Sequence, residues 1–276
     1  ARGPGVDYRL CARQPESMGT WLGASLVDKR LVNHGAWPEC GVPALLLPPG
    51  GDRLGAGPPG GGCIVLDVGA NVGACTLLFA AMGHRVIAVE PEPSNLLLLR
   101  ASLGLPQRAP GRFGRVSVAA AAADETLGEA RIGRDLTNAG HSDVAAQPRD
   151  GVVFSAVRTA PLDDLAAVHA ERLGGHLSDV CLMKIDVEGG GALKALRGAR
   201  RLLAEAVRAV SFEYVPSDPG HTVEELEILA QQGFTIFGNG PEPLEERAYA
   251  PHEFDRLTAV LAAAGRLGTT LVALKL

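Results

Sequence analysis

The chain has 276 residues, of which 46% are hydrophobic, and a net charge of −5. This length supports one large domain with a sizeable core, or two small domains. The acidic balance and the lack of a long block of lysine and arginine disfavour nucleic acid and anionic membranes as partners. No apolar run approaches the roughly 18 residues that span a bilayer, so we expect no membrane span. The composition does not indicate an oligomeric state.

The five cysteines are Cys11, Cys40, Cys63, Cys75 and Cys181, and none forms a C-x-x-C pair. Three of them lie in or beside predicted core elements, where a free cysteine behaves as a small hydrophobic residue. We therefore expect reduced cysteines, with a Cys11–Cys40 disulfide in a secretory compartment as the alternative. The sequence does not identify the compartment, and the expected free thiols, together with the absence of an N-x-S/T sequon, favour the cytoplasm.

Residues 1–62 are interpreted as an N-terminal extension that ends in a linker. They carry no strong periodicity, and the glycine- and proline-rich segment 48–62 forms neither a helix nor a central strand. The main domain is predicted at 63–276. It begins with the apolar run 64–68, which is typical of a buried parallel strand, and continues with a helix over 74–82.

Strands and helices alternate along this domain. Further strands are expected at 85–90, 116–122, 180–187, 207–214, 234–237 and 270–276, and helices at 93–103, 161–170, 192–205, 222–232 and 251–264. The stretch 124–159 looks irregular, with short strand candidates at 130–132 and 152–157. The alternation predicts an α/β fold with a doubly wound, mostly parallel sheet, and the last two strands allow an antiparallel edge strand.

The turn at 69–73 has the features of a nucleotide-cofactor site. Gly69 and Gly73 allow a sharp turn and a close ligand, and Asn71 tolerates left-handed backbone geometry. A dinucleotide site would continue to a third glycine, which is absent here. Asp67, at the strand end, would repel a pyrophosphate. It suits a cofactor that carries an ammonium group, such as S-adenosylmethionine, so a nicotinamide-dependent oxidoreductase is the weaker alternative.

Further acids follow other strands of the predicted sheet. Glu90 lies about 20 residues after the first glycine, where an acid accepts hydrogen bonds from ribose hydroxyls. Asp124 follows the third strand and is a candidate contact to adenine. Asp186, Glu188 and Glu213 come at the carboxyl ends of two later strands, and so at one sheet edge. The acids are scattered over separate strand ends without a histidine-rich cluster, so no metal site is expected.

Three segments resemble the FkbM family of S-adenosylmethionine-dependent methyltransferases. They are Val-Leu-Asp-Val-Gly-Ala-Asn-Val-Gly at 65–73, Val-Glu-Pro at 89–91 and Met-Lys-Ile-Asp-Val-Glu-Gly at 183–189. The resemblance covers roughly residues 64–237. It implies a class I methyltransferase (Rossmann-like) fold with a seven-stranded sheet, S-adenosyl-L-methionine as cofactor, and usually methyl transfer to a hydroxyl oxygen. The family commonly has a second glutamate where this chain has Gly191.

We therefore expect an O-methyltransferase that acts on a hydroxyl of a sugar or a small hydroxylated metabolite, its small-molecule or glycan acceptor. The alternative is a degenerate domain that binds or scaffolds. The predicted cofactor-binding residues are Asp67, Gly69, Asn71, Gly73, Glu90 and Asp124. Asp186, Glu188 or Glu213 is predicted to take the proton of the acceptor. His221 is a minor candidate for this base, and His141 is a minor candidate for the lining of the acceptor pocket. Lys184 shares a strand face with Asp186 and is expected to pair with an acid or to extend toward water.

Overall fold

The computed structural model describes residues 2–3, 6–7, 40–47, 63–105, 114–135, 142–143, 150–188, 190–214, 222–238, 248–263 and 269–275. Cys11, His141 and His221 lie outside these ranges. Near the N-terminus, the short strands β1 (Arg2–Gly3) and β2 (Val6–Asp7) pair antiparallel. None of the helices in the described ranges is long and apolar enough to cross a bilayer.

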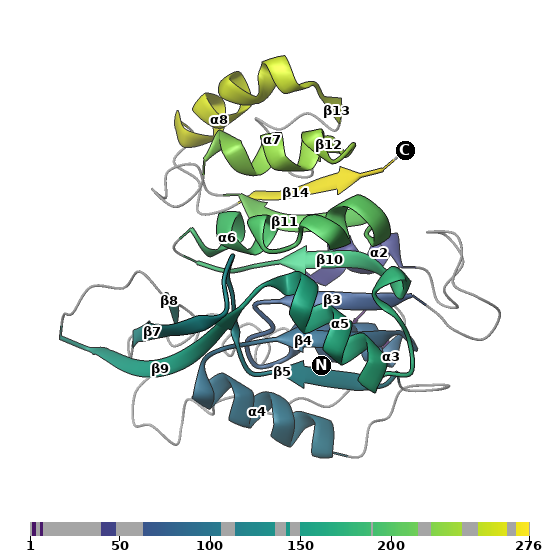
Figure 1. The fold of residues 1–276 in the computed structure, drawn as a ribbon, viewed down its shortest axis with the longest axis vertical. Coiled ribbons are helices and arrows are strands. Elements are labelled where there is room, and N and C mark those ends of the chain that lie inside the picture. Colours follow the sequence, from purple (N-terminus) through teal and green to yellow (C-terminus); the bar gives the residue numbers. More distant parts are fainter. Residues whose placement is uncertain are drawn as a thin grey trace.

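The main sheet has eight strands in the order β13-β12-β14-β11-β10-β3-β4-β5 (Figure 1). Five neighbouring strands are parallel, and they are β3 (Ile64–Val68), β4 (Arg85–Val89), β5 (Val116–Ala119), β10 (Val180–Ile185) and β11 (Ala209–Tyr214). β14 (Thr269–Leu274) runs antiparallel between β11 and β12 (Thr235–Gly238), and β13 (Ala248–Tyr249) is the antiparallel edge. The expected α/β class I methyltransferase fold is confirmed, but the sheet has eight strands where seven were expected, because the short strand β13 adds one at the edge.

Helices cover both faces of this sheet because its strands are apolar on both sides. In β3, Ile64, Leu66 and Val68 join the larger core cluster, whereas Val65 joins the smaller one. The larger cluster includes residues of α5 (Leu162–Arg172), α6 (Gly191–Arg197), α7 (Val223–Gln231) and α8 (Phe254–Ala263). The smaller one includes α2 (Gly41–Leu46) and α3 (Ala74–Ala81), and α4 (Pro93–Gly104) packs on Ala88. Asp67, one place from Leu66 and Val68, faces the α3 side.

The stretch 124–159 was expected to look irregular, with short strand candidates at 130–132 and 152–157. Both strand candidates are confirmed, but the strands are longer and more regular than expected. β7 (Gly128–Asp135) and β9 (Val152–Ala160) form a long antiparallel hairpin, joined by β6 (Ala122–Ala123) and β8 (Ser142–Asp143) in the order β6-β9-β7-β8. The hairpin extends beyond the carboxyl ends of the parallel strands (Figure 1). It buries only a small cluster that includes Ile132 and Val157, so its strands lack the continuous apolar run of a central strand.

The helix expected over 192–205 is divided in two. α6 ends at Arg197, and a π-helical segment follows over Leu202–Ala206. The carboxylate of Asp163, on α5, accepts hydrogen bonds from the backbone N–H groups of Arg201 and Leu202 at 2.9 and 2.8 Å. This cap comes from a residue almost 40 positions away, so a helical period read locally does not reveal it.

Two disulfides correct the expectation of free cysteines. Cys40, beside α2, is bonded to Cys75 of α3, and Cys63, before β3, is bonded to Cys181 of β10. The Cα–Cα distances are 5.1 and 5.5 Å, in the range of natural disulfides. The alternative pairing of Cys40 with Cys11 is therefore also wrong. The pairs are 35 and 118 residues apart, and only the packing of α2 on α3 and of β3 beside β10 brings them together.

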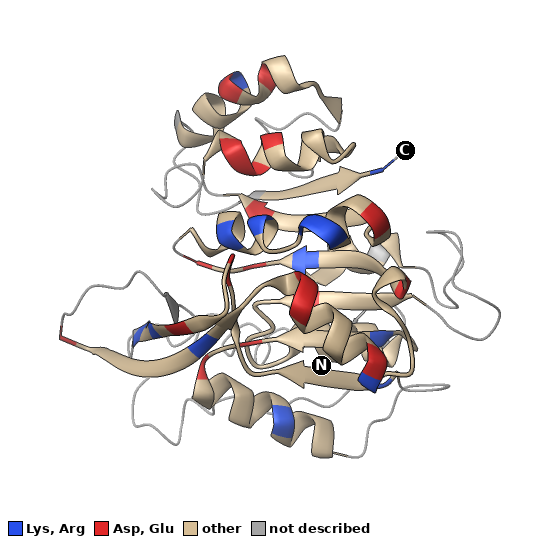
Figure 2. Ribbon diagram, in the orientation of Figure 1, with Lys and Arg blue, Asp and Glu red and all other residues tan. Residues whose placement is uncertain are grey.

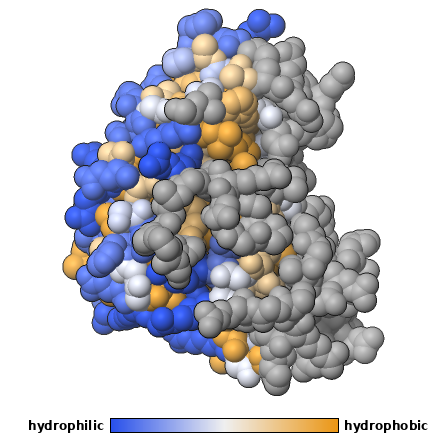
Figure 3. Space-filling view, turned by 90° about the vertical axis from the view of Figure 1, so that its right-hand side faces the viewer, coloured by the Kyte–Doolittle hydropathy of each residue, from blue (hydrophilic) through white to orange (hydrophobic). Residues whose placement is uncertain are grey.

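The parallel strands all begin at one end of the main sheet. Figure 3 views the molecule from this side and shows hydrophilic residues along one flank, with apolar residues gathered in the upper half. The carboxyl ends of the strands carry several acidic residues, beside the hairpin (Figure 2). In open α/β sheets ligands bind at the carboxyl ends, and the acids of the sequence prediction lie at that end.

Candidate active site

The turn between β3 and α3 has a left-handed backbone at three places. Gly69, Asn71 and Gly73 have φ of 78°, 52° and 93°, so the left-handed geometry predicted for Asn71 is confirmed. A Cβ on Gly69 would lie 1.9 Å from the carbonyl oxygen of Asp186, so no side chain fits there. The N–H groups of Gly69 and Ala70 both donate to the carbonyl of Val89. The turn is thus packed between the ends of β4 and β10.

Glu90 holds this turn to the start of α4. Its carboxylate accepts hydrogen bonds from the backbone N–H groups of Asn71 and Glu92 at 2.8 and 2.9 Å, and from the Asn95 amide at 3.3 Å. Burial raises the pKa of Glu90 to about 7, and the three hydrogen bonds oppose this shift only in part. Glu90 therefore has a structural purpose that its place at a strand end does not reveal.

The hairpin is connected to the same region through Glu92. Arg134 of β7 forms an ion pair with Glu92, with its Nε 3.5 Å from Oε1. Glu92 also caps α4 by accepting a hydrogen bond from the backbone N–H of Asn95 at 2.8 Å. The hairpin, α4 and the turn are therefore linked by consecutive polar contacts.

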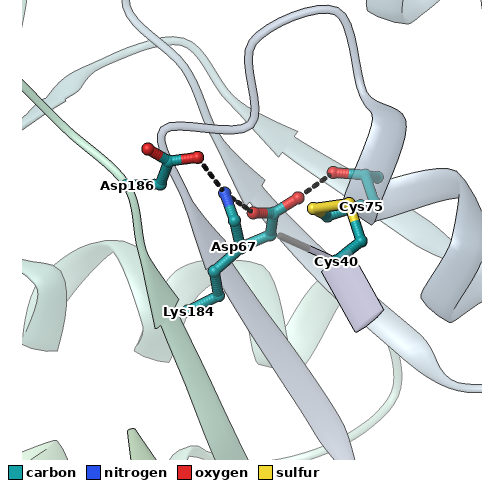
Figure 4. Close-up of a disulfide and its surroundings, with 6 residues drawn as sticks. Cys40, Asp67, Cys75, Lys184 and Asp186 are labelled. Carbon is teal, nitrogen blue, oxygen red and sulfur yellow. Dashed lines mark hydrogen bonds and ion pairs between the residues drawn. A yellow bond between two sulfur atoms is a disulfide. The ribbon is translucent and has the colours of Figure 1, made fainter. Parts of the chain in front are cut away.

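A buried line of charges lies under the turn, on the α3 side of the sheet (Figure 4). Asp67 is 0% exposed, and its Oδ2 accepts a hydrogen bond of 2.6 Å from the Thr76 hydroxyl. The Lys184 Nζ lies 3.2 Å from Asp67 Oδ1 and 3.1 Å from Asp186 Oδ2. Lys184 therefore pairs with acids, one of the two outcomes expected for it.

The protonation of Lys184 follows from these neighbours. Burial acts to lower the pKa of Lys184, but the carboxylates of Asp186 and Asp67 outweigh it, so the pKa is raised. The ammonium therefore stays charged at neutral pH and cannot act as a base. One ammonium and two carboxylates together carry a net charge of −1. Asp186 is the exposed member of the group, with its side chain 28% exposed.

A small cavity opens at the carboxyl ends of β10 and β11. About 220 Å³ of empty space lies in and over it, part of which is open solvent, and its lining residues are Lys184, Ile185, Asp186, Ser211, Phe212, Glu213 and Thr270. It brings together Asp186 and Glu213, two of the three predicted catalytic acids. Ser211 and Thr270 are polar neighbours that the sequence analysis missed. Thr270 comes from the antiparallel β14, and no local pattern indicates that it lies here.

Glu188 and Asp124 lie elsewhere. Glu188 is in the turn between β10 and α6, where its carbonyl accepts a hydrogen bond from the N–H of Gly191, and it is not among the residues that line the cavity. Asp124 follows β6, and its carboxylate forms an ion pair with Lys194 of α6 at 3.3 Å. The two residues are thus positioned by α6, whereas the other predicted acids lie against the turn or the cavity.

The residue that replaces the family's second glutamate is closely packed. A Cβ on Gly191 would lie 3.0 Å from Cγ2 of Val187 and 3.3 Å from its Cβ. A glutamate at this place would therefore require Val187 to move by a few tenths of an ångström. The backbone turns into α6 at Gly190, which has φ of 76°.

The residues present fit a cofactor that carries ribose and an ammonium group and no phosphate. Gly69 and Gly73 let the turn pack against Asp186 and Leu99, and the carboxylate of Glu90 lies against the N–H of Asn71 in the same turn. The negative charge shared by Asp67, Lys184 and Asp186 favours a cation. Within the described ranges, no three histidine, cysteine or acidic residues are grouped so that they could hold a metal ion.

The family model described as the methyltransferase FkbM domain matches residues 67–236, more than half of the chain. No curated protein matches the sequence. Similar solved structures include the bifunctional kinase-methyltransferase WbdD, at 14% identity and a TM-score of 0.41, with 77% of this chain and 34% of that chain covered. The chain thus spans about a third of WbdD.

Two further solved structures are similar over most of both chains. One is magnesium protoporphyrin IX methyltransferase from Synechocystis with bound SAH, at 13% identity and a TM-score of 0.43, with 92% of this chain and 88% of that chain covered. The other is a TehB-like SAM-dependent methyltransferase from Corynebacterium glutamicum, at 13% identity and a TM-score of 0.40, with coverage of 90% and 94%.

Proposed function

Because the chain belongs to the FkbM methyltransferase family, we propose that it methylates a hydroxyl oxygen of a sugar or another small hydroxylated metabolite. S-adenosylmethionine is the methyl donor of this family, and the chain is a methyltransferase that depends on it. The observation that carries the proposal is the cavity in which Asp186 and Glu213 stand together beside the cofactor turn.

The cofactor supplies a methyl group that its sulfonium already makes electrophilic. The chain's own residues then have to bind it, orient the acceptor oxygen and exclude water. In the proposed site, the turn at Gly69 and Gly73 receives the cofactor, and ionised Glu90 accepts hydrogen bonds from ribose hydroxyls. Orientation of two reactants is worth on the order of 7 kcal/mol of the barrier.

Asp186 or Glu213 takes the proton of the acceptor hydroxyl in this mechanism. Both line the cavity, and Asp186 also touches the turn through its carbonyl, so it lies between the proposed cofactor and acceptor sites. A positioned general base contributes roughly 10²–10⁴-fold to such a step. Glu188 was predicted for the same role and remains a proposal with weaker geometric support.

The lining of the cavity favours a neutral acceptor. It contains two acids and no arginine, whereas phosphate and carboxylate groups are usually held by arginine. A neutral hydroxylated acceptor, such as the end of a glycan, therefore suits this lining better than a phosphorylated one.

The proposal is tested by a methyl-transfer screen against glycans and small hydroxylated metabolites, with products identified by mass spectrometry. Formation of a methyl ether is expected. The alternative is a degenerate domain that binds or scaffolds, which Gly191 in place of the family's glutamate motivates. Micromolar binding of S-adenosylmethionine by calorimetry is expected for the enzyme, and a lack of binding would favour the scaffold.

We further propose that the protein works in an oxidising compartment. The expectation of a cytoplasmic protein rested on free cysteines, and the two disulfides remove that basis. Disulfides persist in secreted and lumenal proteins and are rare in the cytosol. Peptide mapping of the protein from its native source without reductant is expected to recover both linked pairs.

We keep 63–276 as the proposed methyltransferase domain, to which α2 is attached through Cys40.

A further inference from the structure

We propose that Lys184 is a positioning residue that fixes the carboxylate of Asp186 at the inner end of the acceptor cavity, with buried Asp67 as its anchor. The proposal rests on the proposed methyl transfer and explains how its base is oriented. Lys184 contacts both acids, at 3.2 Å from Asp67 Oδ1 and 3.1 Å from Asp186 Oδ2 (Figure 4).

The anchor is rigid because secondary structure holds it from two sides. Asp67 and Lys184 are direct partners in the register of the parallel strands β3 and β10, so their side chains leave the sheet at the same level. Thr76, on α3, donates a hydrogen bond of 2.6 Å to the other oxygen of Asp67. Lys184 is therefore fixed against two strands and a helix before it reaches Asp186.

The main chain of Asp186 is also fixed, so only the conformation of its side chain can vary. Its N–H donates to the carbonyl of Val68 at 3.0 Å, and its carbonyl packs against Gly69. Its side chain is 28% exposed, so water competes for the carboxylate unless another group holds it. The ammonium of Lys184 is a buried partner of opposite charge within 3.1 Å. Lys184 therefore determines which way the carboxylate points.

The pair formed by Asp67 and Lys184 is difficult to explain by stability alone. Removing two opposite charges from water costs several kcal/mol for each ion, and a well-packed apolar pair is often as stable. An apolar pair would, however, leave Asp186 without its ammonium. The core could be as stable without this buried ion pair. We therefore attribute the pair to the orientation of Asp186 at the cavity.

The test removes the anchor without leaving a lone buried charge. The double variant Asp67→Asn/Lys184→Met keeps an acceptor for Thr76 and leaves the net charge of the cluster at minus one, as in the wild type. We expect it to bind S-adenosylmethionine within about threefold of the wild type. We expect kcat to fall about a hundredfold, because a displacement of about 1 Å has that effect, with a smaller change in the acceptor KM.

A matched control is available at the other end of the strands. Arg85 and Asp179 form a partly buried ion pair of 3.3 Å, away from the turn and the cavity. The double variant Arg85→Met/Asp179→Asn removes a pair of the same kind and is expected to keep kcat within twofold. If the methionine variant does not fold, Asp67→Asn/Lys184→Leu replaces it with the same expectations.

A crystal structure of the double variant gives a readout that needs no acceptor. We expect the Asp186 carboxylate to leave its wild-type position by more than about 1 Å, or to occupy several rotamers. Addition of Asp186→Asn to the double variant is expected to cause little further loss of kcat. A folded double variant with Asp186 in place, or with wild-type kcat, would overturn the proposal. Failure of the proposed function appears differently, as a wild type without hydroxyl-directed turnover.

Discussion

Lys184 lies beside Asp67 at the same level of two neighbouring parallel strands, and its ammonium also reaches Asp186 at the sheet edge. This relationship changes the role expected for Asp67. A residue that is 0% exposed, with one oxygen bonded to Thr76 and the other facing Lys184, acts from below the site. Asp186 is the acid of this group that a ligand can reach.

The first prediction concerns the acids at the cavity. Asp186→Asn and Glu213→Gln should each lower turnover, and the variant that removes the base should lose about 10²–10⁴-fold. Binding of S-adenosylmethionine should persist, because the turn and Glu90 are unchanged. Glu188→Gln is the matched variant outside the cavity lining and should have a smaller effect. Wild-type turnover in all three variants would show that no carboxylate at this sheet edge acts as the general base.

The second prediction concerns pH. In the proposed site Glu90, with its pKa of about 7, accepts the ribose hydroxyls in its ionised form, so cofactor binding should release a proton below that pH. Affinity measured by calorimetry should be nearly constant above pH 7 and weaken up to tenfold per unit below it. Glu90→Gln should bind more weakly and remove this dependence. A wild type with equal affinity at pH 6 and pH 8 would contradict the role of Glu90.

The same shift has a consequence for the free protein. Because the folded-state pKa of Glu90 lies above its ordinary value of 4.5, its contribution to stability is fully present below pH 4.5 and is lost as the pH rises through 7. The loss is on the order of 3 kcal/mol at neutral pH. Bound cofactor favours the ionised form of Glu90 and should therefore reduce this loss of stability. Thermal melts at pH 4.5 and pH 7, with and without cofactor, can measure the difference.

The third prediction separates backbone strain from lack of space at the turn. Gly69→Ala combines a left-handed φ of 78° with a Cβ that would overlap the Asp186 carbonyl. Gly151→Ala has a similar φ of 81° with no atom within 4 Å, so it is the matched control. We expect the control to lose about 1–2 kcal/mol of unfolding free energy and to bind cofactor normally. Gly69→Ala should lose more and should not bind; equal behaviour of the two would contradict the packed turn.

The fourth prediction compares the two disulfides. The loops that they close span 35 and 118 residues, so replacing either pair by serine should cost roughly 4–5 kcal/mol of unfolding free energy. Cys75 lies next to Thr76 and two residues after Gly73, so Cys40→Ser/Cys75→Ser should also weaken cofactor binding. Cys63→Ser/Cys181→Ser, near the start of the strands, should not. Equal losses of affinity would show that the effect is one of global stability.

The core strands were predictable because their sequence signal is local. Runs such as 64–68 and 180–185 are apolar on both sides, and helices cover both faces of the sheet there. The strand candidates at 130–132 and 152–157 lie within β7 and β9, but the length and the pairing of these strands were not predicted. Few of their side chains are buried, and the pairing joins two separate segments. The positive φ of Asn71 was predictable, since few other residues adopt it.

The acids of the candidate site were proposed from the sequence, whereas Ser211 and Thr270 of the cavity lining and the contacts between these residues were not. Their positions in or just after the ends of strands identified Asp67, Glu90, Asp186 and Glu213. That Glu90 holds the turn, and that Asp67 serves Lys184, depends on contacts between elements 19 to 117 residues apart. The cysteine pairs depend on packing in the same way. A pattern in one segment carries no information about such partners.

The central claim is hydroxyl-directed methyl transfer at the cavity beside the turn. Its most direct test is incubation of the wild type and of Asp186→Asn with methyl-labelled S-adenosylmethionine and a panel of glycans and hydroxylated metabolites, followed by mass spectrometry. We predict a labelled methyl ether on one class of acceptor with the wild type, and strong loss of product with the variant despite retained cofactor binding. Label on nitrogen or carbon, or cofactor binding without any methylated product, would contradict the account.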